Sequence, residues 1–492
     1  MTNSINYQKL PELWMVQSEI CRRNYYQFFK QAWHVNEPAT PLVDNWHIKY
    51  LCDRLQAEVE RMNRGEPRTR DLIINIPPSS SKSSIVTILF PVWCWLQNPS
   101  MKFITASHNE SLSIYHATKS RDVIQSDWFI QRFGHMFTLK VDQNKKSEYQ
   151  NDHKGIRIAT SVGGSITGKH GDILIADDPI DPKKSTSEVE LIRCREWWSK
   201  TISTRMTNSK TAFKVIVMQR LHEDDLTGVC LSQDGDMYEH INLPSEETPH
   251  ITPVDCVANY TDGLLDGVRM DRDMLDRIKI DLGSTGYAGQ MLQHPAPIEG
   301  NLIKHAWFRR FRMVDLVNNA RDDGRDLVWT FVIDGAYTKD QTNDPTGVMA
   351  FCIFNNEMWI RDVQSVWLEM PELLKFIPDF VHQNGYTAQS RIYIEPKANG
   401  LSASQMLKRT TGLNVIIDKS PTTDKVARVN GVSPFIEAGR VNLLDGGTWV
   451  ESFVHQCTTF PNAKHDDEVD CLTMAIDKQQ HTKNRVSSFE IY

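Results

Sequence analysis

The sequence lacks the features that mark exported or membrane-spanning proteins. Its nine cysteines form no CxxC pair, so neither a disulfide framework nor a zinc site is predicted, which fits a reducing cytoplasm. The longest apolar run, IVTILFPVWCWL over residues 85–96, contains Pro91 and is shorter than the roughly 20 residues of a membrane span. The N-terminus shows no basic segment followed by an apolar one, as a secretory signal would. We expect no membrane partner.

An excess of positive charge is also lacking, because 62 acidic residues outnumber 55 basic ones and the formal net charge is −7. Nucleic-acid-binding proteins usually carry a basic footprint. A basic groove can coexist with acidic outer faces, and KHAWFRRFR (304–312) is either such a local cluster or solvated surface. The length of 492 residues, with 40% hydrophobic and 24% charged residues, predicts a globular chain of two domains.

Glycine is missing from the stretch where it is most expected, LIINIPPSSSKSSIVTILF (72–90). An apolar strand, a tight loop, Lys82-Ser83 and an apolar helix are the layout of a phosphate-binding loop. The usual pattern G-x-x-x-x-G-K-[ST] would place glycine at Ile76 and Ser81. A left-handed non-glycine residue costs about 1–2 kcal/mol, so a working loop must be strained or differently turned. The alternative is an ordinary strand-loop-helix that contains a lysine.

A second stretch, GGSITGKH (163–170), matches the glycine spacing better. His170 replaces the hydroxyl residue, however, and a strand rather than a helix follows, so we predict a glycine-rich connector. That strand, ILIADDP, ends in Asp177-Asp178, the form of a Walker B motif. One carboxylate would bind Mg²⁺ through water and the other would polarise the attacking water. Two solvated aspartates at a strand end are the simpler interpretation, but the combination with Lys82-Ser83 favours an ATP site.

The C-terminal part has a second set of carboxylates. Asp334 and Glu395 each end a predicted strand, and Asp467 and Asp470 lie on one face of the last predicted helix. Carboxylates from two strands and a helix are the ligand set for two divalent ions, Mg²⁺ or Mn²⁺, that cleave a phosphodiester. Each carboxylate alone fits a strand end or a helix N-terminus equally well. The ordered trio favours a nuclease.

The alternation of apolar runs predicts an α/β chain. Helices over 1–70 precede a mainly parallel sheet of P-loop NTPase type with flanking helices, and a mixed α/β domain follows. The predicted boundaries are 1–300 for the first domain, 301–325 for a linker and 326–492 for the second domain. The predicted strands are 71–76, 102–106, 155–160, 173–176 and 213–218, then 327–334, 347–354, 358–367, 391–395 and 441–444.

Motifs along roughly 40–480 carry a family likeness. They include NWHIKYLCDRL, LIINIPPSSSKS, GGSITGKHGDILIADDPI, VIVMQRLHEDDLTG, IYIEPKANG and FPNAKHDDEVD. In this order they resemble the large subunit of tailed-bacteriophage terminases, which are ATP-driven DNA-packaging motors joined to an RNase H-like nuclease.

For the first domain, the resemblance implies an ATP site. Lys82 and Ser83 would serve the ATP phosphates and Mg²⁺, and Asp177 would be the Walker B metal residue. Asp178 stands where many relatives carry a catalytic glutamate, and this shorter acid is expected to slow hydrolysis or to shift the base role elsewhere. The remaining implied nucleotide-binding residues are Ser79, Ser80, Ser81, Gln219 and Arg220.

Three further expectations concern residues around this site. Gln219 and Arg220 would couple the nucleotide state to movement. Trp46 and His47 would lie near the adenine, or would simply pack their helix. The family often has an arginine in the phosphate loop, so Arg205, Arg220 or an arginine of a neighbouring subunit would have to supply that charge.

For the second domain, the resemblance implies a metal-dependent DNA endonuclease. Asp334, Glu395 and Asp467 would hold the metal ions, with Asp466, Asp470 or His465 in support. The resemblance leaves open which of Asp466, Asp467 and Asp470 is the principal metal ligand. Asp344 and Lys425 are weaker candidates. Asp344 would otherwise cap a turn before Pro345, and Lys425 would otherwise pair with a surface acid.

The resemblance implies translocation of double-stranded DNA into a procapsid and cleavage of concatemeric DNA. The implied partners are duplex DNA, a small terminase subunit and the portal protein, with a homo-oligomer on the portal and a monomer allowed in solution. The expected location is the cytoplasm of an infected bacterium, transiently at the procapsid portal. The rival hypothesis is a DNA-binding packaging adaptor or nuclease whose ATPase site is degenerate and inactive.

Overall fold

The computed structural model of the chain describes residues 12–295, 302–335, 345–395, 400–418, 424–461 and 465–487. As far as the residues are described, one compact unit contains Met1–Arg277 and Thr285–Pro297, and the other contains Ile278–Ser284 and Ile298–Tyr492. The chain passes between them within α9 (Arg272–Gln290), whose helical geometry is interrupted at Gly283, where φ is 66°. None of the described helices is long and apolar enough to cross a bilayer.

The N-terminal unit is built on an eight-stranded sheet of order β3-β4-β5-β2-β6-β7-β1-β8. All pairings are parallel except those of the β3–β4 hairpin at one edge. The five strands predicted in this region are confirmed, whereas β3, β4 and β8 lack the apolar runs that would have announced them. The strands are β1 (Asp71–Asn75), β2 (Lys102–Ser107), β3 (Leu139–Asn144), β4 (Glu148–Asn151), β5 (Ile156–Ser161), β6 (Ile173–Asp177), β7 (Phe213–Met218) and β8 (Tyr238–Asn242).

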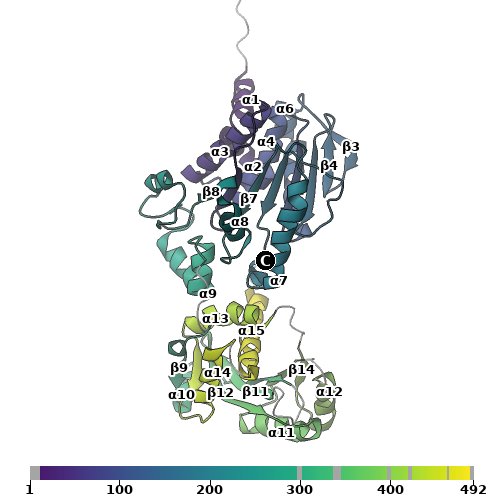
Figure 1. Ribbon diagram of the computed structural model, residues 1–492. Helices are drawn as coiled ribbons and strands as arrows, with labels where there is room; N and C mark the ends of the chain where they lie inside the picture. Colours follow the sequence, from purple (N-terminus) through teal and green to yellow (C-terminus); the bar gives the residue numbers. More distant parts are fainter. Residues whose placement is uncertain are drawn as a thin grey trace, which may run out of the picture. The chain divides into compact units, whose positions relative to one another are not determined.

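Helices cover both faces of this sheet, which explains why the central strands are apolar throughout (Figure 1). Leu72 and Ile74 of β1 pack into one core and Ile73, between them, packs into the other. The first core is formed with α1 (Leu13–Arg23), α2 (Tyr25–Asn36), α3 (Trp46–Asn63), the π-helical η1 (Ser84–Leu89), α4 (Phe90–Gln97), α5 (Glu110–Gln125) and α6 (Asp127–Phe133). The second is formed with α7 (Glu188–Glu196), η3 (Trp197–Thr201) and α8 (Leu226–Asp234).

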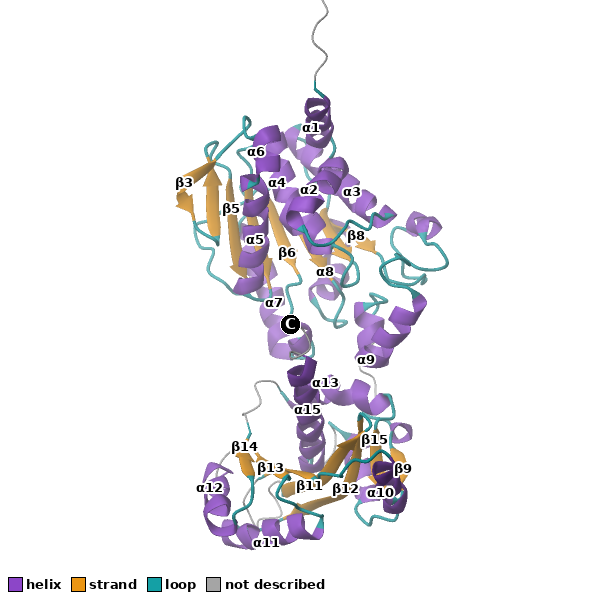
Figure 2. Ribbon diagram, turned by 180° about the vertical axis from the view of Figure 1, so that it is seen from behind, coloured by secondary structure: helices purple, strands orange, loops and turns teal. Residues whose placement is uncertain are grey.

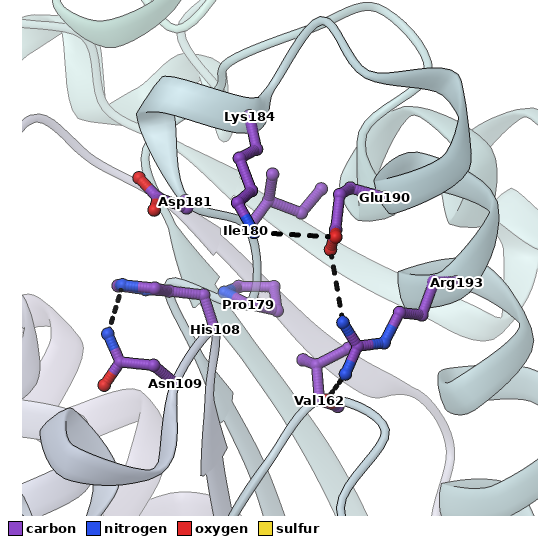
Figure 3. Close-up of a pocket in the computed structure, with 9 residues that line it drawn as sticks. All are labelled: His108, Asn109, Val162, Pro179, Ile180, Asp181, Lys184, Glu190 and Arg193. Carbon is purple, nitrogen blue, oxygen red and sulfur yellow. Dashed lines mark hydrogen bonds and ion pairs between the residues drawn. The ribbon is translucent and has the colours of Figure 1, made fainter. Parts of the chain in front are cut away.

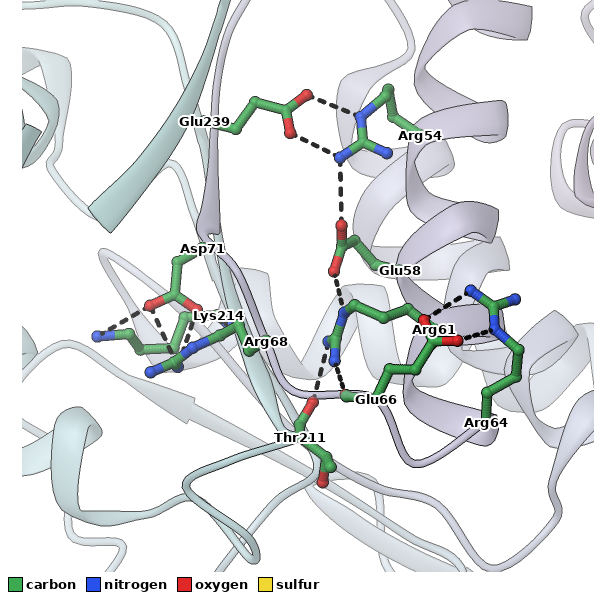
Figure 4. A network of polar contacts seen from close by, with 10 residues as sticks. All are labelled: Arg54, Glu58, Arg61, Arg64, Glu66, Arg68, Asp71, Thr211, Lys214 and Glu239. Atoms are coloured by element: carbon green, nitrogen blue, oxygen red, sulfur yellow. Dashed lines mark hydrogen bonds and ion pairs between the residues drawn. The ribbon is translucent and has the colours of Figure 1, made fainter. Parts of the chain in front are cut away.

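A network of charged side chains ties α3 to the sheet (Figure 4). Arg54 donates two hydrogen bonds of 2.7 Å to the Glu239 carboxylate on β8. Arg61 pairs with Glu58 at 2.8 Å, and its guanidinium also donates to the Thr211 carbonyl at 3.0 Å. The side chains of Arg61 and Glu58 are 9% and 8% exposed, so this pair is buried and fully engaged.

We expect Arg61→Met to lower the free energy of unfolding by about 3 kcal/mol, because it leaves the buried Glu58 carboxylate without one of its two cations. Urea unfolding of the full chain measures this change. Arg64→Met is the matched control on the same helix end, because its pair with Glu66 is exposed and should contribute nothing measurable. Equal effects of the two variants would contradict the buried-network interpretation.

The C-terminal unit contains a seven-stranded mixed sheet of order β14-β13-β10-β11-β12-β15-β9. Three antiparallel strands, β10–β11–β12, form its centre, and the other pairings are parallel. The five strands predicted here are confirmed. The strands are β9 (Arg309–Phe311), β10 (Thr330–Asp334), β11 (Thr346–Phe354), β12 (Glu357–Val366), β13 (Arg391–Ile394), β14 (Val415–Ile417) and β15 (Val441–Leu444).

Helices again cover both faces of this sheet (Figure 2). Their bounds are α10 (Met313–Asp322), α11 (Met370–Gln383), α12 (Gly400–Thr411), α13 (Lys425–Glu437), α14 (Val450–Thr459) and α15 (Asp467–Ser487). Residues 301–325, expected to be a linker, instead include β9, which pairs with β15, and α10, which packs through Leu316 and Ala320. The arginines of β9 concealed it, because only Phe311 of this three-residue strand is buried.

Candidate nucleotide and nuclease sites

The serine loop after β1 adopts the strained conformation that its lack of glycine implied. Ser79 and Ser81 have φ angles of 61° and 63°, in the left-handed region that favours glycine. Ser81 occupies the second glycine position of the phosphate-loop pattern. The backbone therefore makes the glycine-type turn at this position with a serine.

This loop meets the end of β6 at one edge of the sheet. Lys82 Nζ lies 3.2 Å from Asp178 Oδ2, and Ser83 Oγ donates to Asp177 Oδ1 at 3.1 Å. The backbone N–H of Gln219, directly after β7, donates to Asp178 Oδ1 at 3.2 Å. The structure thus brings these five residues together, because β1, β7 and β6 are adjacent and parallel and their carboxyl ends share one edge.

The two carboxylates at this edge differ in environment, because Asp177 is fully buried whereas the Asp178 side chain is 24% exposed and pairs with Lys82. Burial raises the pKa of Asp177 and of Asp178, and the charge of Lys82 only partly offsets it. Asp177 Oδ2 is buried and accepts no hydrogen bond from the described residues, although the ring of His116 lies 3.4 Å away. Burial and the charge of Arg157 lower the pKa of His116 to about 4, so its imidazole is neutral at pH 7. An unsatisfied carboxylate oxygen beside a serine hydroxyl fits a hydrated Mg²⁺ ion.

A partly buried histidine, His240, is expected to make the stability of this unit sensitive to acid. Burial, with the charge of Arg220, lowers the pKa of His240 on β8 to about 4, and its Nε2 lies 2.8 Å from Asn75 Oδ1. The folded-state pKa is depressed, so the unfolded chain binds the proton first and stability falls as pH drops from about 6.5 towards 4.

We expect His240→Gln to reduce the loss of unfolding free energy between pH 7.5 and pH 4.5 by about 2 kcal/mol. Urea titrations at the two pH values measure the difference. His153→Gln, at a half-exposed position, should leave the pH dependence unchanged. If the two variants behave alike, His240 does not contribute to the acid sensitivity.

Of the arginines of this chain expected near the phosphates, Arg220 has other partners. Arg220 Nε pairs with Asp225 at 2.9 Å, and its Nη2 donates to the carbonyls of His222 and Glu223. Asp225 is the N-cap of α8, so the Arg220 side chain folds back onto the turn between β7 and α8. For Arg205, the backbone carbonyl accepts a hydrogen bond from the N–H of Gly171, and the guanidinium Nε is buried without a hydrogen bond to any of the described residues.

The arginine that does reach the loop is one the sequence did not indicate. Arg269 Nη1 donates to Ser81 Oγ at 2.8 Å, although the two residues are 188 positions apart. No motif marks Arg269, because its role depends on the path of the chain between β8 and α9. Only the fold could have identified it.

Of the two residues expected near the adenine, one touches the loop. His47 is fully buried and its Nε2 lies 3.1 Å from the Ser80 carbonyl oxygen. Trp46 packs against Tyr260 and Tyr50 at ring-centroid distances of 5.8 and 6.3 Å. His47 therefore supports the serine loop, and Trp46 packs α3.

The competing stretch 163–170 is a connector, as predicted. β6 follows it directly, and Lys169 pairs with Glu148 of β4 rather than with a carboxylate of β6. Gly163, with a φ of 78°, lies where a Cβ would come within 2.8 Å of Arg193 Nη2. Its glycine thus makes room for Arg193 beside a cavity of about 120 Å³ that also borders His108 and Pro179 (Figure 3).

In the C-terminal unit, the three carboxylates expected at a nuclease site come to one edge of the sheet. Asp334 ends β10, and the N–H of Glu395 donates to the carbonyl of Ile333 at 3.2 Å. Gly347 pairs with Asp334 across β10 and β11, and a Cβ on it would lie 2.9 Å from the carbonyl oxygen of Asp467. Glu395 and Asp467 are 4% and 3% exposed.

Two acids near Asp467, namely Asp466 and Asp470, form ion pairs with basic side chains of α13. Lys425 Nζ lies 2.6 Å from Asp466 Oδ1 and 3.1 Å from Asp470 Oδ2, and Arg428 Nη2 lies 2.7 Å from Asp470 Oδ1. Burial opposes the charge on Lys425, but the two aspartates outweigh it and raise its pKa. Lys425 therefore pairs with one buried and one part-buried acid rather than with a surface acid. His465 instead contacts the ring of Trp367, at a centroid distance of 5.8 Å.

The carboxylates as placed do not surround a single point. Within the described ranges, no three His, Cys, Asp or Glu side chains are gathered as metal ligands would be. Asp344 lies outside the described residues. The backbone thus brings Asp334, Glu395 and Asp467 to one edge of the sheet, but their side chains are not grouped around a single point.

One protein-family model matches part of this unit. Residues 385–479 match the model of the terminase RNaseH-like domain. The chain resembles the large terminases. The matched segment runs from the end of α11 into α15 and includes Glu395 and Asp467, so it covers two of the three carboxylates. No curated protein matches the sequence.

Several solved terminases align with the chain. The large terminase of a thermophilic bacteriophage, in complex with ADP, is 10% identical, covering 82% of this chain and 90% of its own, with a TM-score of 0.46. The HK97 bacteriophage large terminase is 9% identical, covering 92% and 99%, with a TM-score of 0.38. The Mn-soaked human cytomegalovirus terminase nuclease domain is 16% identical, covering 34% and 88%, with a TM-score of 0.26. At these scores, no residue role in this chain follows from them.

Proposed function

We propose that this chain is the large subunit of a viral terminase, which uses ATP hydrolysis to move double-stranded DNA into a procapsid and cuts concatemeric DNA. The observation that carries the proposal is the match to the terminase RNaseH-like domain over residues that hold Glu395 and Asp467 beside Asp334. The phosphate loop of the N-terminal unit supports the ATP-driven half of the same proposal.

In the N-terminal unit, Lys82 would contact the ATP phosphates, and the N–H groups of the serine loop would bind their oxygens. Ser83 and Asp177 would hold Mg²⁺, which when bound neutralises the charge that develops on the transferred phosphoryl group. Asp178 would orient the attacking water. Its ion pair with Lys82 supports this role, because it places the carboxylate beside the lysine that would contact the phosphates. Gln219 binds Asp178 through its backbone and would report the state of the site to β7.

In the C-terminal unit, Asp334, Glu395 and Asp467 would hold divalent ions, Mg²⁺ or Mn²⁺. Such ions, when bound, lower the pKa of a water and stabilise the leaving oxygen of a phosphodiester. Asp466 and Asp470 each contact Lys425, so they would orient this lysine beside the site rather than bind a metal directly.

The proposed partners are duplex DNA, a small terminase subunit and the portal protein, with a ring of like subunits on the portal. The proposed place of action is the cytoplasm of the infected bacterium. The rival function, an adaptor with an inactive ATPase site, is less well supported, because Lys82 pairs with Asp178 and Ser83 bonds Asp177 despite the glycine-free loop.

We expect Asp334→Asn to leave procapsid filling intact while the formation of new DNA ends fails, because it removes one carboxylate of the nuclease site alone. A packaging reaction with procapsids, small subunit and ATP, followed by gel analysis of the DNA ends, measures both. The control is Asp326→Asn, an exposed residue eight positions earlier. If filling and end formation fail together in Asp334→Asn, the proposed division between the two units is wrong.

A further inference from the structure

The serine loop contains two residues in a conformation that they do not favour. Ser79 and Ser81 have φ angles of 61° and 63°. A left-handed L-residue persists only where the surrounding structure holds it there. Glycine would adopt the same turn without such support.

Contacts from outside the loop supply that support. Arg269 Nη1 donates to Ser81 Oγ at 2.8 Å and to the Ser79 carbonyl at 3.4 Å, and its Nη2 donates to the Val43 carbonyl at 2.5 Å. The guanidinium is also anchored 3.4 Å from Asp266, and the Arg269 side chain is only 13% exposed. His47 lies against the Ser80 carbonyl, so each of the three serines is contacted from outside.

We infer that Arg269 is a positioning residue that keeps the glycine-free phosphate loop in its nucleotide-binding conformation. This inference rests on the proposed function, because it assumes that the loop binds ATP. It also accounts for serine at position 81, whose hydroxyl accepts the bond from Arg269. The planar guanidinium bonds Ser81 and Val43 at once, which a lysine ammonium on a flexible stem does less well.

The test is a coupling experiment on the full chain. Calorimetry measures the Kd for a non-hydrolysable ATP analogue with Mg²⁺ in two backgrounds, the natural loop and the loop carrying Ser79→Gly and Ser81→Gly. In the natural loop, Arg269→Met should weaken binding about tenfold, equivalent to about 1.4 kcal/mol, which is the strain of one left-handed residue. In the glycine background, the same substitution should cost less than about twofold, because no strain remains to be held.

The control is Arg272→Met, three residues along the same segment, whose side chain is 61% exposed and bonds Glu246 and Asp262 instead of the loop. Arg269→Lys should fall between the natural chain and Arg269→Met. An equal loss in both backgrounds overturns the inference, because Arg269 would then act on the ligand or on the folding of its own segment. No loss in the natural loop overturns it as well.

Failure of the proposed function would look different. A natural chain that binds no nucleotide, like Lys82→Ala, overturns both the ATP site and the inference. A natural chain that binds nucleotide but is insensitive to Arg269→Met overturns the inference alone.

Discussion

Lys82→Ala is expected to reduce ATP hydrolysis by at least about 100-fold, the cost of losing one preorganised charge at a developing oxyanion. Lys82 is buried, and its ammonium lies 3.2 Å from Asp178 at the edge where Ser83 meets Asp177. In the variant, the phosphates would lose their only cation from the serine loop, and Asp178 would lose its nearest positive charge. Steady-state hydrolysis with and without duplex DNA measures the effect.

Lys169→Ala is the matched control, because Lys169 belongs to the stretch with the better glycine spacing. It pairs with Glu148 on the edge hairpin, so its loss should change hydrolysis less than about twofold. If Lys169→Ala abolishes activity and Lys82→Ala does not, the phosphate site is in the wrong loop. If the natural chain and Lys82→Ala are equally inactive with DNA and partners present, the result supports the rival hypothesis of an adaptor with a degenerate ATPase site.

The positions of three candidate site carboxylates could be predicted from the sequence, because each lies where a strand ends. Asp177, Asp334 and Glu395 each lie at or directly after the end of a strand, because apolar runs mark strands of a covered sheet and a polar residue marks the point where the strand leaves the core. The parallel order of β1, β7 and β6 then brings loops distant in sequence to one edge.

The remaining features depend on contacts that carry no local signal. Arg269 and Ser81 meet through the fold, and Lys425 is found between Asp466 and Asp470 only once α13 packs against α15. The edge strand β9 and strand β4, which lies next to the edge strand β3, are short and polar, so their periodicity is weak. The sequence also left open which aspartate near 467 binds metal, and Asp467 is the one that we propose.

Asp467→Asn is expected to abolish DNA cleavage, with a loss of about 10³-fold or more, because a bound metal contributes several kcal/mol of charge stabilisation and each 1.36 kcal/mol is tenfold in rate. Lys425 pairs with Asp466 and with Asp470, and the backbone of Asp467 lies against Gly347 at the edge that holds Asp334. Cleavage of plasmid DNA by the full chain in Mg²⁺ or Mn²⁺ measures the loss, and a chelator should abolish the activity of the natural chain.

Substitutions of other aspartates on α15 test whether an aspartate binds the metal or only supports the site. Asp470→Asn should lower stability as well as activity, because it leaves Arg428 and Lys425 without a carboxylate that is 6% exposed. Asp477→Asn, ten residues beyond Asp467 on α15 and half-exposed, should cleave normally. If Asp470→Asn loses cleavage at unchanged stability while Asp467→Asn keeps it, Asp470 rather than Asp467 is the metal ligand, and Lys425 must leave it when the ion binds.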